Sequence, residues 1–182
     1  GSRTSWSGGV KTWCYDYQNK LVEVRESGEE FAEYDHDVLG RRIAKRYWYN
    51  TLELDYNVEK RFYYAGSALI QEYDLSGTDG SVSAEAKDME YFWGQSTAEP
   101  CQERKYDLLT GSLELTGYYH QNAAASVYAI TSAASGAPLI ETIRYDEYGT
   151  SYHYAGDGSI GYSLSGTTWA WHGRFLDREL SS

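Results

Sequence analysis

Residues 34–45, YDHDVLGRRIAK, combine a Tyr–Asp pair, a glycine and a following segment that contains strand-forming residues. Glycine tolerates positive φ, and Asp side chains accept backbone N–H bonds in turns, so the middle of the segment favours a tight reversal. The residues from Arg41 to Tyr49 have mixed faces, which is typical of a sheet with one solvated side. We therefore interpret this segment as a strand, a turn and the start of the next strand.

Strand patterns of this kind dominate the rest of the chain. In residues 21–25, LVEVR, the two valines share one face and the charged residues share the other, as in a half-buried strand. Residues 82–90 are the one segment that allows a short helix. The sequence therefore predicts an all-β fold. Further strands are expected at residues 60–64, 68–73, 89–93, 113–119, 126–131, 139–145 and 168–172.

Tyr–Asp pairs recur along the chain, at spacings of 19, 39, 33 and 39 residues. Three of these four spacings fit one or two units of roughly twenty residues, as expected of strand–turn–strand repeats. Several pairs are followed by a Gly or Lys and then by an apolar strand. We therefore expect consecutive antiparallel β-hairpin repeats. The repeated positions are Tyr15, Asp16, Tyr34, Asp35, Gly40, Arg41, Tyr73, Asp74, Tyr106, Asp107, Gly111, Tyr145, Asp146 and Gly149.

Each Tyr–Asp pair is expected to end a strand, with the ring packed on the sheet and the carboxylate bound to backbone N–H groups of the next turn. A set of catalytic carboxylates is the alternative, but catalysis needs one convergent pair rather than periodic copies. Outside the repeat, Glu103, Asp157 and Asp177 would support an enzyme only if two of them faced each other in a cleft. We expect no catalytic residue and no enzyme.

Several segments, in this order, resemble the YD-repeat or Rhs-repeat proteins, and in particular their C-terminal repeat-associated core region. Residues 34–45 resemble the family unit in which YD is followed by GRR and a lysine, and residues 62–74 resemble the next copy. The resemblance runs from about Trp13 to Glu179, and its later segments are residues 118–131, 140–149 and 169–179. It departs at residues 123–125, three alanines, where the family has an acid-containing turn that closes in Gly.

The resemblance implies a wall of β-hairpins that forms a curved or spiral sheet. In complete family members this wall builds a hollow shell around a C-terminal cargo such as a toxin. The family's self-cleavage uses an Asp-Pro segment; here Pro100 follows Glu and Pro138 follows Ala, so self-cleavage is not expected. We expect a non-enzymatic structural module of a large bacterial protein, secreted or at the cell surface, whose partners are the remaining repeats of the parent chain.

The chain is expected to be one repeat array, residues 13–182, in which residues 77–100 can be an irregular insertion. Residues 1–12 are expected to be a tag remnant and leader, because Gly1-Ser2 is typical of a cleaved expression tag. Open sheet edges at both ends would favour self-association. Cys14 and Cys101 allow either one disulfide or two separate buried thiols, and we favour the thiols.

The composition excludes other classes of protein. The chain has 182 residues, a formal net charge of −11 and 16% aromatic residues. Disordered chains have few aromatic residues, so the acidity belongs to a folded surface. Nucleic-acid binding needs a basic footprint, which this chain lacks. No apolar stretch is long enough to span a bilayer.

Metal and cofactor motifs are incomplete. Asp35, Asp37 and Gly40 begin like an EF-hand loop, but Leu39 occupies a ligand position and Arg46 stands where the loop needs a glutamate. The histidines and cysteines have no short metal-ligand spacing. We therefore expect no metal and no cofactor.

The tryptophans offer an alternative function. Trp48, Trp169 and Trp171 would form a ligand platform if their rings were exposed, since aromatic faces stack on ligands and anchor interfaces. The chain would then be an adhesive β domain that binds a carbohydrate or a protein partner. Otherwise the tryptophans pack between successive turns of the wall.

Overall fold

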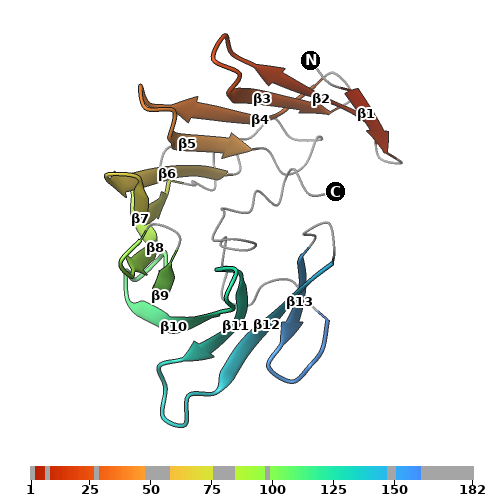
Figure 1. Cartoon of the computed structure of the whole chain (residues 1–182). Coiled ribbons are helices and arrows are strands. Elements are labelled where there is room, and N and C mark those ends of the chain that lie inside the picture. The colour runs from red at the N-terminus through yellow and green to blue at the C-terminus, as the bar shows by residue number, and fades with distance from the viewer. Residues whose placement is uncertain are drawn as a thin grey trace. The chain divides into compact units, whose positions relative to one another are not determined.

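The computed structural model describes residues 3–6, 9–26, 29–47, 58–75, 85–96, 99–146 and 151–160, which form strands joined by turns, with no helix among them. The predicted all-β class is confirmed (Figure 1). The chain divides into two compact units, the first ending at Lys87 and the second beginning at Asp88.

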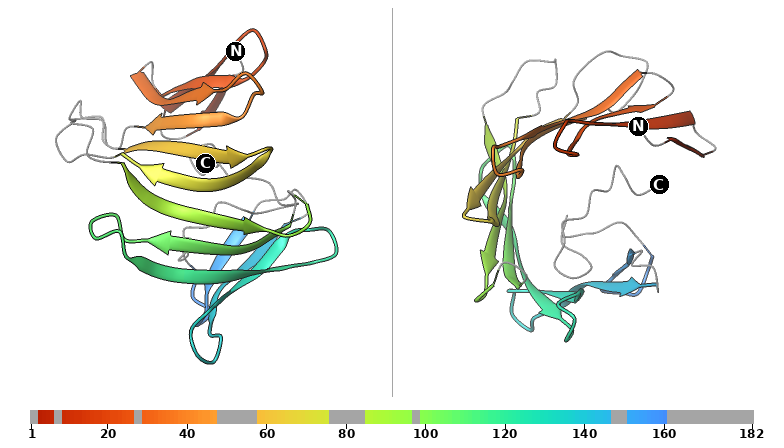
Figure 2. Two further views of the ribbon diagram at one scale, coloured as in Figure 1. Left: turned by 90° about the vertical axis from the view of Figure 1, so that its left-hand side faces the viewer. Right: turned by 45° about the horizontal axis from the view of Figure 1, so that its top comes forward.

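Consecutive strands of the first unit pair antiparallel with one another, so the predicted succession of hairpins is confirmed here. Neighbouring strands of this unit lie side by side (Figure 2). The strands are β1 (Arg3–Trp6), β2 (Gly9–Tyr15), β3 (Leu21–Glu26), β4 (Glu29–His36), β5 (Arg42–Tyr47), β6 (Val58–Ala65) and β7 (Ala68–Asp74).

The second unit continues the same pattern from the boundary onward, again with antiparallel pairing between neighbours. The segment that allowed a helix, residues 82–90, is strand from Ala86 onward, because its residues pair with β9. The predicted strand at 168–172 lies outside the described residues. The strands are β8 (Ala86–Trp93), β9 (Pro100–Tyr106), β10 (Leu113–Gln121), β11 (Val127–Ser132), β12 (Leu139–Tyr145) and β13 (Ser151–Ala155).

In the first unit, the pleat separates a buried face, which includes Lys45 and Glu72 beside its apolar residues, from a charged face. Val24 lies opposite Ala32, and both side chains are fully buried. The other face carries Glu33 opposite Arg46, whose Nη2 donates to Asp35 Oδ2 at 2.8 Å. The two faces therefore need different side chains, as in a sheet with one solvated side.

The core of the second unit combines apolar and acidic side chains. Tyr91 and Ile130 are almost fully buried. Glu103 lies opposite Tyr91, and Glu141 lies opposite Ile130. Since directly opposed residues share a face of the sheet, both acids lie on the buried side.

Three hairpin turns, residues 16–20, 37–41 and 122–126, have the same hydrogen bonds. In each, the first residue's N–H donates to the fifth residue's carbonyl, and the fourth residue's N–H donates to the first residue's carbonyl. The first residue is Asp or Asn, and its side-chain oxygen accepts the N–H groups of the third and fifth residues. The fourth residue has positive φ: 61° at Asn19, 83° at Gly40 and 58° at Ala125. This is a type I turn closed by a left-handed residue.

Ala125 is the strained member of the set, because left-handed backbone costs about 1–2 kcal/mol for residues other than Gly, and Asn, as at position 19, tolerates it better than Ala. We expect Ala125→Gly to raise the free energy of unfolding by roughly 0.5–1 kcal/mol, since the extra backbone entropy of glycine offsets part of the relief. Chemical denaturation measures this change. Ala124→Gly is the matched control: Ala124 is an exposed neighbour that does not have positive φ, so this variant should be no more stable than the parent. Equal effects of the two substitutions would contradict the assignment of strain to Ala125.

Candidate functional site: the hairpin turns and the buried acids

The Tyr–Asp pairs occupy two kinds of position. Asp16 and Asp107 directly follow β2 and β9 and accept backbone N–H groups of their turns, the arrangement expected from the sequence. Asp35 does not do so, and the expectation is wrong there. It lies inside β4 and is bound to Arg46. Because Tyr34 is buried at 3% exposure, the next residue points to the charged face, and β4 continues to the true turn acid, Asp37.

The other predicted repeat positions lie at strand ends, in turns or outside the described residues. Tyr73 and Asp74 end β7, and Tyr145 ends β12 just before Asp146. Gly40 and Gly111 both have positive φ in their turns. Gly149 and the predicted platform residues Trp48, Trp169 and Trp171 lie outside the described residues.

Tyrosine hydroxyls connect neighbouring strands. Tyr145 on β12 donates to the Val127 carbonyl on β11 at 2.6 Å. Tyr106 on β9 donates to Glu90 Oε2 on β8 at 2.9 Å. Burial raises the pKa of the Tyr145 hydroxyl far above its ordinary value. These contacts need a neutral phenol that donates, so the tyrosines act as cross-strand ties.

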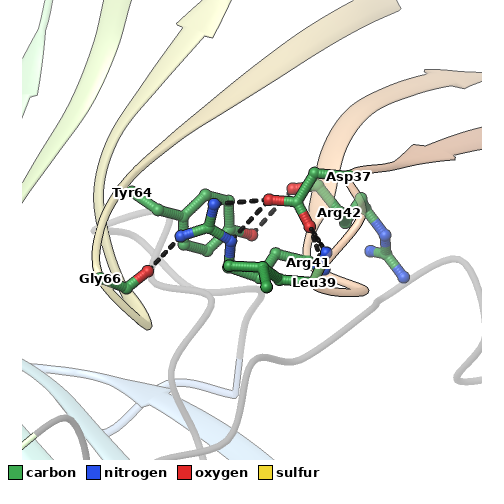
Figure 3. A network of polar contacts seen from close by, with 6 residues as sticks. All are labelled: Asp37, Leu39, Arg41, Arg42, Tyr64 and Gly66. Atoms are coloured by element: carbon green, nitrogen blue, oxygen red, sulfur yellow. Dashed lines mark hydrogen bonds and ion pairs between the residues drawn. The ribbon is translucent and has the colours of Figure 1, made fainter.

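Arg41 is the centre of a polar network between two hairpin turns (Figure 3). Its Nε and Nη2 contact Asp37 Oδ2 at 2.6 and 2.5 Å, and its Nη1 donates to the Gly66 carbonyl. The guanidinium lies over the Tyr64 ring, 5.0 Å from the centroid. The Tyr64 hydroxyl donates to the Arg42 carbonyl at 2.8 Å. One side chain thus joins the β4–β5 turn to the β6–β7 turn.

The network shifts the acid–base behaviour of its members. Desolvation alone would raise the pKa of Asp37, but hydrogen bonds from the Arg41 side chain and from the N–H groups of Arg41 and Leu39 bring that pKa below its ordinary value. Burial raises the pKa of Tyr64 to about 12, against the opposing effect of Arg42. The structure therefore holds Asp37 as the charged form and Tyr64 as the neutral form.

Two buried acids in the second unit have specific donors. Glu103, with no solvent exposure, accepts a hydrogen bond from the Tyr119 hydroxyl. A Cβ on Gly117, the residue opposite, would lie 3.1 Å from Glu103 Oε1, so the glycine leaves room for the acid. Glu141 is 1% exposed and contacts His153 Nδ1.

The contact between Glu141 and His153 extends to a third residue, Ser151, which raises the question of a catalytic triad. His153 Nε2 lies 3.2 Å from Ser151 Oγ, so serine, histidine and acid follow in the order of a nucleophilic triad. Such a site also needs N–H donors aimed at the developing oxyanion. Ser151 and His153 instead face Tyr145 and Ile143 in the β12–β13 ladder, and the described residues include no helix whose N-terminus could serve. The network therefore gives a buried acid a hydrogen-bond partner.

Sequence reasoning missed this network and the role of Asp37. The sequence shows that Ser151 and His153 are two residues apart and so share a face of a strand. Their contact with Glu141, however, depends on the register of β12 against β13. The turn acid Asp37 stood two residues after the repeated Tyr–Asp pair. Of the unassigned acids, Asp157 accepts hydrogen bonds from Ser159 in an exposed turn, and Asp177 lies outside the described residues.

The described part of the chain shows neither a metal-binding cluster nor a disulfide. No group of three His, Cys, Asp or Glu side chains there could hold a metal ion. No helix there is long and apolar enough to cross a membrane. Cys14 is half-buried and Cys101 is exposed, and both are free thiols. The expectation of a buried thiol is therefore wrong for Cys101.

No protein-family model matches the chain, and no curated protein is significantly similar to it.

The raised pKa of Tyr64 predicts a loss of stability in alkali. A group whose folded pKa lies above its unfolded value of about 10 contributes fully below pH 10, and the contribution is lost as the pH rises through about 12. After allowance for the partial exposure of the ring, we expect this loss to be about 1–2 kcal/mol. Tyr64→Phe keeps the ring under Arg41 and should lose less stability between pH 10 and pH 12.

Denaturant unfolding at a series of alkaline pH values tests this. Tyr17→Phe is the control, because the Tyr17 residue is 94% exposed, and it should keep the parent's alkaline profile. If Tyr64→Phe and the parent lost stability equally over this range, the assignment to Tyr64 would be wrong.

Proposed function

We propose that this chain is a structural module, a segment of a hairpin-repeat wall that serves as a scaffold or enclosure in a larger protein. The observation that carries the proposal is the recurrence of one turn at residues 16–20, 37–41 and 122–126, with the same hydrogen bonds each time. Periodic turns between consecutive antiparallel strands are what a chain needs to extend one sheet indefinitely.

The polar side chains support a scaffold role because internal contacts occupy them. Asp16, Asp37 and Asp107 bind backbone N–H groups of their turns. Arg46 lies within 4 Å of three acids, Glu33, Asp35 and Glu59. Acids used in this way hold the sheet together and are not gathered for catalysis.

The resemblance to YD-repeat proteins extends this proposal. On that basis the chain belongs to a large bacterial protein that is exported or displayed at the cell surface, and its wall encloses or presents a C-terminal cargo such as a toxin. Its partners are the remaining repeats of the same parent chain.

A scaffold predicts that the purified chain performs no chemistry on itself or on a probe. We expect one unchanged intact mass during storage and no labelling of Ser151 by a fluorophosphonate, measured by mass spectrometry. Ser151→Ala is the control, and it identifies any label that does not depend on this residue. Labelling of the parent that this substitution removes would overturn the non-enzymatic assignment.

The binding alternative is tested on the same sample with a glycan panel, read by tryptophan fluorescence. The second unit does expose aromatic residues, since Tyr118, Tyr128 and Tyr152 are each between 44% and 48% exposed. A fluorescence change with one sugar class would favour the adhesive domain over the scaffold.

A wall segment also predicts self-association, because an unpaired strand edge is a template for another chain. We expect sedimentation velocity to show dimers or longer assemblies as the protein concentration rises. A strictly monomeric profile at high concentration would contradict this prediction.

A further inference from the structure

Two turns of the first unit end in a basic residue, and both lie at the same end of the strands. Because neighbouring strands are antiparallel, the β2–β3, β4–β5 and β6–β7 turns all lie at this end. The fifth residue is Lys20 in the first of these turns and Arg41 in the second. In both turns the N–H of this residue donates to the turn acid at 2.9 Å. We name these two residues the turn cations.

The side chain of the first turn cation reaches the next turn. A Cβ built on Gly40 would lie 2.9 Å from Lys20 Cε and 3.3 Å from Lys20 Nζ. The end of the lysine therefore lies against the glycine that closes the β4–β5 turn. Gly40 thus combines positive φ with an open side that the lysine occupies.

The second turn cation makes the equivalent step to the following turn. Arg41 is held by Asp37 of its own turn and donates through Nη1 to the carbonyl of Gly66 in the β6–β7 turn (Figure 3). Gly66 also has positive φ, 61°. The contacts differ in detail, since the lysine packs against the glycine and the arginine bonds its carbonyl. In both cases a cation from one turn meets the left-handed glycine of the next.

We propose that each of the two turn cations couples its own hairpin to the next hairpin whose turn lies at the same end of the strands. In each case the cation contacts the left-handed glycine of that next turn. The inference rests on the proposed wall function and adds to it the residues that join successive repeats. It accounts for a difference between the first two turns. The fourth residue has positive φ in both turns, but a Cβ at Gly40 would also displace the end of Lys20 that packs there.

Arginine suits position 41 because its guanidinium carries several N–H donors that point in different directions. A planar group with several N–H donors can bind Asp37 and the Gly66 carbonyl at the same time. The ring of Tyr64 below it adds a cation–π contact. Lys20 carries one compact charge on a flexible stem, and packing against Gly40 does not require several donors.

Hydrogen exchange on the full chain, resolved by residue with NMR, tests the coupling. Lys20→Ala removes the side-chain end that packs against Gly40, and Arg41→Met keeps most of the side-chain length and removes the guanidinium. We expect Arg41→Met to speed exchange at Ala65–Leu69 by about tenfold, and Lys20→Ala to do the same at Asp37–Arg41. Arg61→Met is the matched control, because Arg61 pairs with Glu59 on its own strand at 3.6 Å. It should leave exchange in both turns unchanged.

The critical result is which turn shows faster hydrogen exchange after each substitution. Arg41→Met should leave exchange at Asp16–Lys20 unchanged, because the side-chain contacts of Arg41 are with Asp37 and Gly66. If each substitution altered only its own turn, or if Arg61→Met had the same effect, the coupling would be overturned while the wall function stood. Failure of the wall function would appear instead in the parent, as labelling of Ser151 or as glycan binding.

Discussion

The hairpins depend on one constraint: the chain must reverse within a few residues and still satisfy the N–H groups that the bend frees. An Asp or Asn at the first turn position solves half of the problem, because its side-chain oxygen accepts two of those N–H groups. A residue with positive φ at the fourth position solves the other half, because its twist matches that of the antiparallel strands. Asp37 and Gly40 show both parts within one turn.

The turn also determines which side chains share a face. In the β4–β5 hairpin, the strand pairing also shifts by one position between Asp35 and His36, close to the turn. Any further slip would move a strand's buried residues to the charged face, since side chains alternate along a strand. Val24 and Ala32, both fully buried, would then lie among charged side chains. Correct turns are therefore needed for the buried and charged faces to form.

The sequence predicted the fold class and the hairpins because strand alternation and glycine turns are local signals. It misplaced Asp35, because a Tyr–Asp pair does not show how far its strand continues. The turn at Ala125 forms without the expected glycine, because strand pairing on both sides overrides the local preference. The contact of Glu141 with His153 was invisible, since it depends on the register of two strands that only the folded sheet defines.

The buried acids contribute more to register than to stability. Burying a carboxylate is costly even when it is well bonded, and an apolar side chain in its place is often as stable. Glu103 nevertheless fits in one strand register. In this register the Tyr119 hydroxyl donates to Glu103, and Gly117 on the opposite strand leaves the space that the acid needs. In a sheet of similar hairpins, where many slipped pairings would bury comparable apolar area, such a group penalises every other register. Specific polar contacts of this kind let repeated strands with similar sequences pair in one way.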